Sequence, residues 1–420
     1  MDFRKIIAEI SRIILGATFL FSGTVKAIDP VGGAIKMEDY FGAFGLSFFN
    51  PLALFVSINL SAVEFLLGLC IIMAVYRKLT TICMVAFMAF MTLLTLYLAI
   101  FNPVHDCGCF GEAIIISNWQ TFFKNIFVLF PASVITYIYH KKLTPIYTYK
   151  AYWFVLLFGY IFSAGFSYYN YRNLPIIDFR PFKIGTNISQ AMSFPEGAPS
   201  DEYLFIYEKK DGKKEEFTPE KAPAGDDNWK FIEAKLIKQG YIPPITSFEL
   251  YDKNENNIAD IILEDNNGVV LLISPHLEKA DDGKIDEINH IYDYSIENNL
   301  KFYCVTSSTA ENINAWINDT GAEYPFLTAD DVTLKTIIRS NPGLVLLKSG
   351  TILTKWHYND IPSEENASAV INELLNPSGQ KSDKEMSPWV LIVCCFTLPL
   401  LLVWIYDYFR NRRKGNILSN

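Results

Sequence analysis

The fold is decided by an apolar run close to the N-terminus, IIAEISRIILGATFLFSGTVKA, which occupies residues 6–27. A run of about 20 apolar residues is long enough to cross the hydrocarbon core of a bilayer, about 30 Å thick, as an α-helix. The run is followed by Asp29-Pro30 without a small-residue cleavage site, and it is longer than the apolar core of a signal peptide. We therefore interpret it as the first membrane span.

Five later runs of similar length predict a protein that crosses the membrane six times in all. The chain of 420 residues is 50% hydrophobic and only 19% charged, whereas soluble domains carry about 25% charged residues. Pro131 falls inside the fourth run, which a spanning helix tolerates when its neighbours satisfy the freed backbone carbonyl. The later runs lie near residues 52–75, 79–101, 121–140, 150–169 and 388–406.

Positive charges near the ends of the spans predict the orientation, because loops rich in Lys and Arg stay in the cytoplasm. One alternating set of flanks is rich in these residues, whereas the opposite short loops, 28–50 and 102–120, contain only Lys36. Both termini are therefore expected in the cytoplasm of a bacterium and residues 170–387 in the periplasm, with the protein in the inner membrane. The flanking residues are Arg4, Lys5, Arg12, Arg77, Lys78, Lys141, Lys142, Lys150, Arg410, Arg412, Arg413 and Lys414.

The long segment between the fifth and sixth spans is acidic and faces water. Residues 171–385 hold 21 Lys and Arg against 36 Asp and Glu. An acidic segment without a basic stripe argues against nucleic acid as a partner. With 7 Cys in 420 residues the chain is not a disulfide scaffold either. The expected partners are the lipid bilayer and a periplasmic or membrane protein.

The second half of this segment has an order of strands and helices, βαβαββα, that resembles a thioredoxin-like fold. Asn341-Pro342, just before the hairpin, resembles the cis-proline position of that fold. The hairpin turns at Ser349-Gly350, a pair that favours tight turns. The expected strands are 269–274, 301–306, 324–328, 343–348 and 351–357, and the expected helices are 283–298, 309–319, a segment ending at Arg339, and 363–375.

This predicted domain lacks the redox motif that the resemblance implies. Thioredoxin-like oxidoreductases carry C-x-x-C directly after the first strand, where a helix N-terminus lowers a thiol pKa. Here that position reads SPHLEK (274–279), and Cys304 lies within a strand as a buried thiol. We expect a redox-inactive docking module, in which His276 is either a surface residue or a ligand-binding residue in the vacated pocket.

The segment HDCGCFG (105–111) carries the chemistry, on the expected extracytoplasmic face after the third span. Gly108 permits the tight backbone that a disulfide between Cys107 and Cys109 needs, and strained disulfides exchange readily. The pair is therefore a thiol–disulfide exchange site, a static disulfide that pins the loop, or half of a metal site with His105. Tetrahedral zinc would still lack a fourth ligand, so no bound metal is predicted.

These motifs resemble the DoxX and MauE group of bacterial membrane proteins. The resemblance rests on RIILGATFLFSGTVKAIDP (12–30), the four-span block and the CGCFG loop, and it covers residues 1–145. The attached domain and last span look like the version found in Bacteroidota, in which a DoxX-like domain precedes a thioredoxin-like region. The resemblance implies thiol redox or electron transfer, as in maturation of disulfide-rich periplasmic enzymes or quinone-coupled sulfur oxidation. The residues that match it are Cys107, Gly108, Cys109, Phe110 and Gly111 in the loop, and Gly23 and Lys26 at the end of the first span.

A carboxylate inside a span is a second candidate site. Glu64 lies about half way along the second span, where a bare carboxylate needs a partner or a proton. Lys26 would reach it if the second helix begins late. Such a pair would hold the bundle together, or would bind a quinone and pass protons. Lys124, at the outer start of the fourth span, is expected to extend to the membrane interface.

The remaining membrane cysteines cannot resolve a disulfide in the loop. Cys70 and Cys83 lie near the inner face, about 25 Å of bilayer away. Cys394 and Cys395 point in different directions from the last span. Electrons must therefore come from, or pass to, a partner protein or a quinone.

Two functional hypotheses from different classes fit this multi-domain membrane protein. In the first, it is a thiol-redox or electron-transfer component, an oxidoreductase component in which Cys107 and Cys109 exchange and the thioredoxin-like domain docks the partner. In the second, it is a non-enzymatic scaffold of an envelope complex with a structural disulfide. The expected regions are a DoxX-like four-helix transmembrane bundle (1–145), a fifth span (146–170), a small β-rich adaptor (171–265), the α/β thioredoxin-like domain (266–378), and a linker, a C-terminal transmembrane helix and a basic tail (379–420).

Overall fold

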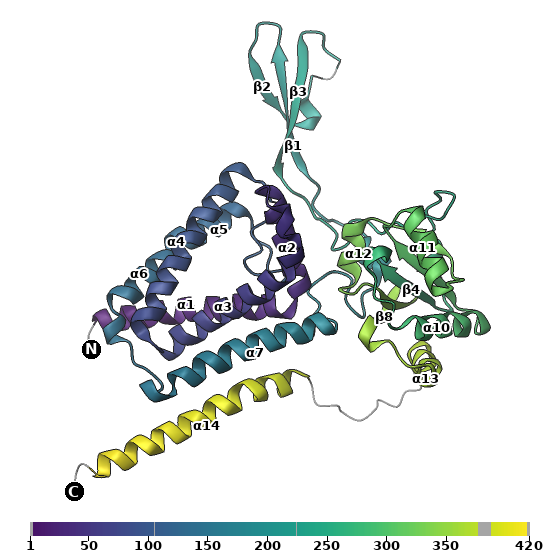
Figure 1. Cartoon of the computed structure of the whole chain (residues 1–420). Helices are drawn as coiled ribbons and strands as arrows, with labels where there is room; N and C mark the ends of the chain where they lie inside the picture. Colours follow the sequence, from purple (N-terminus) through teal and green to yellow (C-terminus); the bar gives the residue numbers. More distant parts are fainter. Residues whose placement is uncertain (1–2, 105, 224, 377–387, 418–420) are drawn as a thin grey trace.

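The chain is a multi-pass membrane protein with a large domain outside its apolar helices (Figure 1). The computed structural model describes residues 3–104, 106–223, 225–376 and 388–417. Within these residues, six helical segments are long and apolar enough to cross a membrane, judged by length and composition. They are α1 (Phe3–Ile28), η1 with α3 (Ser47–Leu52, Ala53–Met73), α4 (Arg77–Phe101), α5, η2 and α6 (Asn118–Lys124, Asn125–Leu129, Phe130–Ile138), α7 (Tyr152–Arg172) and α14 (Pro388–Ile417).

Helices α1 and α3 cross with their backbones in close contact. A Cβ added at Gly23 would lie 2.5 Å from the backbone nitrogen of Phe65, and one added at Gly68 would lie 2.6 Å from that of Leu20. Small residues that let backbones approach are typical of helix packing in membranes. The crossing brings the C-terminal half of α1 beside the middle of α3.

A further helix, α2 (Pro30–Ala43), lies where a short loop over residues 28–50 was expected. The side chain of Asp29 accepts a hydrogen bond from the backbone N–H of Gly32, and Pro30 occupies the first turn. An Asp cap followed by Pro is a common start of a helix. The loop prediction was wrong because Asp29-Pro30 was interpreted only as the end of the first span.

The domain beyond α7 is built on a five-stranded sheet of order β6-β5-β4-β7-β8. Strands β4, β5 and β6 are parallel to one another, and β7 pairs antiparallel with both β4 and β8. The peptide bond Asn341–Pro342 before β7 is cis. This topology is thioredoxin-like, as the order of the elements predicted. The bounds are β4 (Val269–Ser274), β5 (Lys301–Thr306), β6 (Phe326–Thr328), β7 (Gly343–Lys348) and β8 (Thr351–His357).

Two hydrophobic cores cover the two faces of this sheet. One contains residues of α10 (Ile285–Glu297), α11 (Ala310–Thr320) and α13 (Glu364–Leu375). The other contains residues of α12 (Asp331–Ile337), α8 (Ile188–Met192) and α9 (Ala259–Leu263), together with Phe182 and Phe248. Part of the region expected to be an adaptor over 171–265 therefore packs into the same core as the sheet.

A second, smaller sheet lies within the adaptor region. Its order is β2-β1-β3, all antiparallel, with β1 (Glu202–Lys209), β2 (Lys214–Phe217) and β3 (Trp229–Lys238). Figure 1 shows that it extends away from both the helical bundle and the five-stranded sheet. It takes no part in the site described below.

Candidate functional site

The loop between α4 and α5 brings the two predicted cysteines into contact. Gly108 and Gly111 have φ values of +63° and +52°, a conformation that favours glycine. With the chain turned in this way, the Sγ atoms of Cys107 and Cys109 lie 2.7 Å apart. Both cysteines are free thiols and both are buried.

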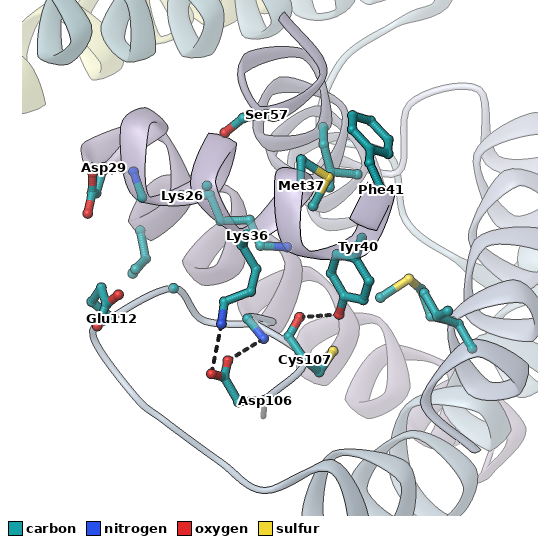
Figure 2. A pocket seen from close by; sticks show the side chains of 18 of the residues that line it. Lys26, Asp29, Lys36, Met37, Tyr40, Phe41, Ser57, Asp106, Cys107 and Glu112 are labelled. Carbon is teal, nitrogen blue, oxygen red and sulfur yellow. Dashed lines mark hydrogen bonds and ion pairs between the residues drawn. The ribbon is translucent and has the colours of Figure 1, made fainter. Parts of the chain in front are cut away.

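Helix α2 holds this loop through two polar contacts, which Figure 2 shows. The carboxylate of Asp106 accepts a hydrogen bond from the ammonium of Lys36 at 2.9 Å. The hydroxyl of Tyr40 donates to the carbonyl oxygen of Cys107 at 2.9 Å. Helix α2, which was not predicted from the sequence, therefore positions the cysteine loop.

The predicted ion pair inside the bundle reaches the same loop. The Nζ atom of Lys26 lies 2.6 Å from Oε1 of Glu64, and their side chains are only 13% and 4% exposed. The hydroxyl of Ser22 lies 2.7 Å from Oε2 of Glu64 and 2.6 Å from the carbonyl oxygen of Cys109. A chain of polar groups thus runs from the interior of the bundle to the cysteines, and the two candidate sites are one site.

Two ammonium groups, those of Lys124 and Lys26, lie near Cys109. The ammonium of Lys124 lies over the ring of Phe110, 4.2 Å from its centroid. Lys124, Lys26 and Cys109 line a small cavity of about 30 Å³. The hydrogen bond from Cys107, followed by the charges of Lys124 and Lys26, outweighs burial and lowers the pKa of Cys109 from 9.0 to about 7. The same hydrogen bond and burial raise the pKa of Cys107, so the negative charge of the pair is favoured on Cys109.

Alkylation of Cys109 should therefore titrate with a midpoint near pH 7. The thiolate is the reactive form, so the labelling rate by iodoacetamide should rise through this pH and then level off. In a Lys124→Met variant the midpoint should move upward, because one stabilising positive charge is lost. Mass spectrometry of the reduced protein measures the labelling rate at Cys109. A wild-type midpoint near the ordinary value of 9.0 would contradict this charge distribution.

A larger, mostly apolar cavity of about 330 Å³ lies beside Cys107 (Figure 2). Its volume falls in the range of sites for small organic ligands. Among the polar side chains that line it are Lys26, Asp29, Lys36 and Tyr40. The apolar wall includes Met37 and Phe41 of α2, and Phe87, Phe90, Met91 and Leu94 of α4.

Four residues of the site were not identified as site residues from the sequence. They are Ser22, Lys36, Tyr40 and Lys124. Ser22 could have been identified from the sequence, because it lies four residues before Lys26 and this spacing places both side chains on one face of a helix. The same spacing relates Lys36 to Tyr40, but it has no meaning until residues 30–43 are recognised as a helix.

Cys70 and Cys304 lie apart from this site. His105, the third candidate metal ligand, is outside the described residues. In the part of the chain that the structure describes, no three His, Cys, Asp or Glu side chains are grouped as metal ligands. Cys70 belongs to a different apolar cluster. Cys304 is fully buried in the five-stranded sheet of the domain beyond α7, here called the outer domain.

In the outer domain, His276 occupies the position after β4 where the redox motif was expected. Its ring nitrogens lie 3.4 Å from a carboxylate oxygen of Glu278 and 3.2 Å from one of Asp331. The carbonyl of His276 accepts a hydrogen bond from Asn341 at 2.8 Å, so it lies beside the cis-proline loop. The side chain is 32% exposed.

Comparisons with known proteins support the MauE part of the resemblance. Residues 4–138 match the family model described as "Methylamine utilisation protein MauE", and residues 201–239 match a "Domain of unknown function (DUF8463)". No curated protein matches the chain. A solution structure of "a putative protein disulfide isomerase from Bacteroides thetaiotaomicron" is 18% identical, with 30% of this chain and 85% of that chain covered and a TM-score of 0.26. The N-terminal region of this multi-pass membrane protein is thus MauE-like.

Proposed function

We propose that this chain is a membrane thiol–disulfide redox component that acts on the extracytoplasmic face through Cys107 and Cys109. The observation that carries the proposal is the contact of the two sulfurs, 2.7 Å apart, in a loop joined through Ser22 to the Lys26–Glu64 pair. Charged residues inside a membrane bundle are costly and usually serve a function. The MauE-like N-terminal region is compatible with this role.

The exchange step begins with the oxidised pair. A thiolate of the partner protein attacks the sulfur of Cys107, a mixed disulfide forms, and the Cys107–Cys109 bond breaks. The sulfur of Cys109 leaves as a thiolate, because a low thiol pKa favours departure and the charges of Lys124 and Lys26 stabilise it. The partner's second thiol then attacks the mixed disulfide, which oxidises the partner and leaves Cys107 and Cys109 reduced by two electrons.

Reoxidation of the pair requires an acceptor of two electrons and two protons. The cavity beside Cys107 suits a lipid-soluble quinone, because its wall is mostly apolar and carries several polar groups, which is the usual composition of a small-molecule site. A quinone bound there would supply the electron acceptor. Lys26 and Glu64 would then serve to accept and pass on protons.

The structural-disulfide alternative has less support from the geometry. A purely structural disulfide would be needed if no other contact held the loop in its conformation. Instead, Lys36 binds Asp106, Tyr40 binds the backbone of Cys107, and Ser22 lies against the backbone of Cys109. The loop is held in place while both cysteines are free thiols.

The proposal includes an orientation and a role for the outer domain. Both termini are placed in the cytoplasm and residues 170–387 in the periplasm of a bacterial inner-membrane protein, because Lys and Arg flank the opposite ends of the spans. The thioredoxin-like domain then lies on the same side as the cysteine loop. We assign it to partner docking, with His276 in place of a redox motif.

Single cysteine variants test this function. The trap uses the reverse of the step above, which begins with the reduced pair and an oxidised partner. In Cys109→Ser, Cys107 should attack the partner's disulfide and form a mixed disulfide that persists, because Cys109 is not there to displace the partner. In Cys107→Ser, trapping should be at least about tenfold weaker, since Cys107 is the sulfur that bonds to the partner in either direction. Non-reducing electrophoresis of native membranes, followed by mass spectrometry, detects the adduct and identifies the partner.

The double variant Cys107→Ser, Cys109→Ser is the control, and it should trap nothing. If none of the variants traps a partner, and the wild-type pair resists mild reductant until the protein is unfolded, the loop carries a structural disulfide and the exchange function is wrong. Loss of the protein itself in the double variant would also favour the scaffold.

A further inference from the structure

An ion pair joins the outer domain to the membrane bundle next to the cavity. The guanidinium of Arg339 donates to both carboxylate oxygens of Asp29 at 3.0–3.1 Å. The two side chains are only 5% and 10% exposed. Arg339 lies three residues before the cis Pro342, so the contact is made by the cis-proline loop of the thioredoxin-like domain.

Arg339 also bridges two parts of the cavity wall. Asp29 and Gly32 come from the start of α2, and Glu112 comes from the cysteine loop, three residues after Cys109. All three line the cavity beside Cys107. The guanidinium lies 3.8 Å from a carboxylate oxygen of Glu112, in addition to its contacts with Asp29. A Cβ on Gly32 would lie 2.8 Å from the same guanidinium, which shows how closely Arg339 packs against this wall.

The charges around Arg339 make this contact depend on Asp29. Arg180, which is also buried, lies close enough to Arg339 to repel it, and Asp178 is already shared between Arg180 and Lys355. Asp29 therefore supplies the negative charge that Arg339 needs. Conversely, without Arg339 the carboxylates of Asp29 and Glu112 would repel each other across the cavity wall.

We infer that Arg339 is a clasp through which the thioredoxin-like domain closes the outer wall of the cavity and controls access to Cys107. While the clasp is shut, both sulfurs are buried. When a partner engages the domain and withdraws Arg339, the wall loses the contacts that join Asp29 to Glu112, and it opens. The inference concerns the same cysteines as the proposed function, but it is a statement about access, so it remains testable if the pair does not exchange.

The test is the rate at which a bulky maleimide labels Cys107 and Cys109 in the reduced full-length protein in lipid nanodiscs. Asp29→Asn removes the charge but keeps a residue that caps a helix well, and Arg339→Gln removes the guanidinium. Each variant should label about tenfold faster than wild type or more, because one partner of a buried charge pair is lost. Lys279→Gln, at an exposed position of the same domain, should label at the wild-type rate.

Cys304 serves as an internal reporter of folding, because it is fully buried in the domain. Faster labelling of the loop with Cys304 unlabelled supports the clasp. Wild-type labelling rates in both Asp29→Asn and Arg339→Gln would overturn it. Faster loop labelling that appears only together with labelling of Cys304 would overturn it as well, because unfolding and not opening would then be the cause.

Discussion

Replacing Glu64 by Ala is expected to lower the free energy of unfolding of the bundle by about 3–5 kcal/mol, because it leaves the buried ammonium of Lys26 without its partner. The same change removes the carboxylate oxygen beside Ser22, which lies against the backbone of Cys109. Exchange at the cysteine pair should therefore fall together with stability. Reversible unfolding by SDS in mixed micelles measures the first effect.

The matched control removes both charges at once. The double variant Glu64→Gln, Lys26→Met keeps an oxygen near Ser22 and leaves no unpaired charge, so it should be far more stable than Glu64→Ala. Replacing both partners of a buried ion pair is often close to neutral, whereas removing one is strongly destabilising. If Glu64→Ala unfolds at the same SDS concentration as the double variant, the pair contributes little and the proposed link to the loop loses its support.

The membrane helices were predictable from the sequence because hydropathy over about 20 residues reports directly on the cost of placing a segment in lipid. Helix α2 was not, since Pro30–Ala43 is too short to span and contains Lys36, Glu38 and Asp39. Its start could still have been recognised from the Asp29 cap and Pro30. Hydropathy alone finds spans but not the helices that lie beside them.

In the outer domain, too, some elements were predictable from the sequence and others were not. The strands of the five-stranded sheet were predicted because β4 is buried along its whole length and the hairpin of β7 and β8 has a tight turn. The contribution of Phe182 and Phe248 to the same core was not predicted. These residues lie in segments without regular periodicity, where sequence gives no indication of which face is buried.

At the site, the sequence indicated residue types and the fold brought them together. Cys107, Cys109, Glu64 and Lys26 were selected for separate reasons, a C-x-C motif and a charge inside a span. Their connection depends on Ser22, whose position follows from the close crossing of α1 and α3. A lone serine in an apolar run carries no signal of such a role.

The other large effect is expected at the apolar cavity. In a Leu94→Trp variant the indole should occupy the space beside Cys107, since Leu94 lines the cavity of about 330 Å³. Oxidation of the reduced pair by a soluble quinone such as decylubiquinone should then fall about a hundredfold, because small displacements of reacting groups already cost that much. The assay follows hydroquinone formation and the loss of two free thiols per protein in nanodiscs.

The adjacent residue on the same helix provides the matched control for this experiment. Leu93 is 69% exposed and does not line the cavity, so Leu93→Trp adds the same indole on the outer surface of α4 and should leave quinone reduction unchanged. Equal rates in Leu94→Trp and Leu93→Trp would show that electrons do not leave through this cavity. If the wild-type pair reduces no quinone while Cys109→Ser still traps a partner, the exchange function stands and the acceptor is a second protein, because the disulfide must be regenerated by something outside the loop.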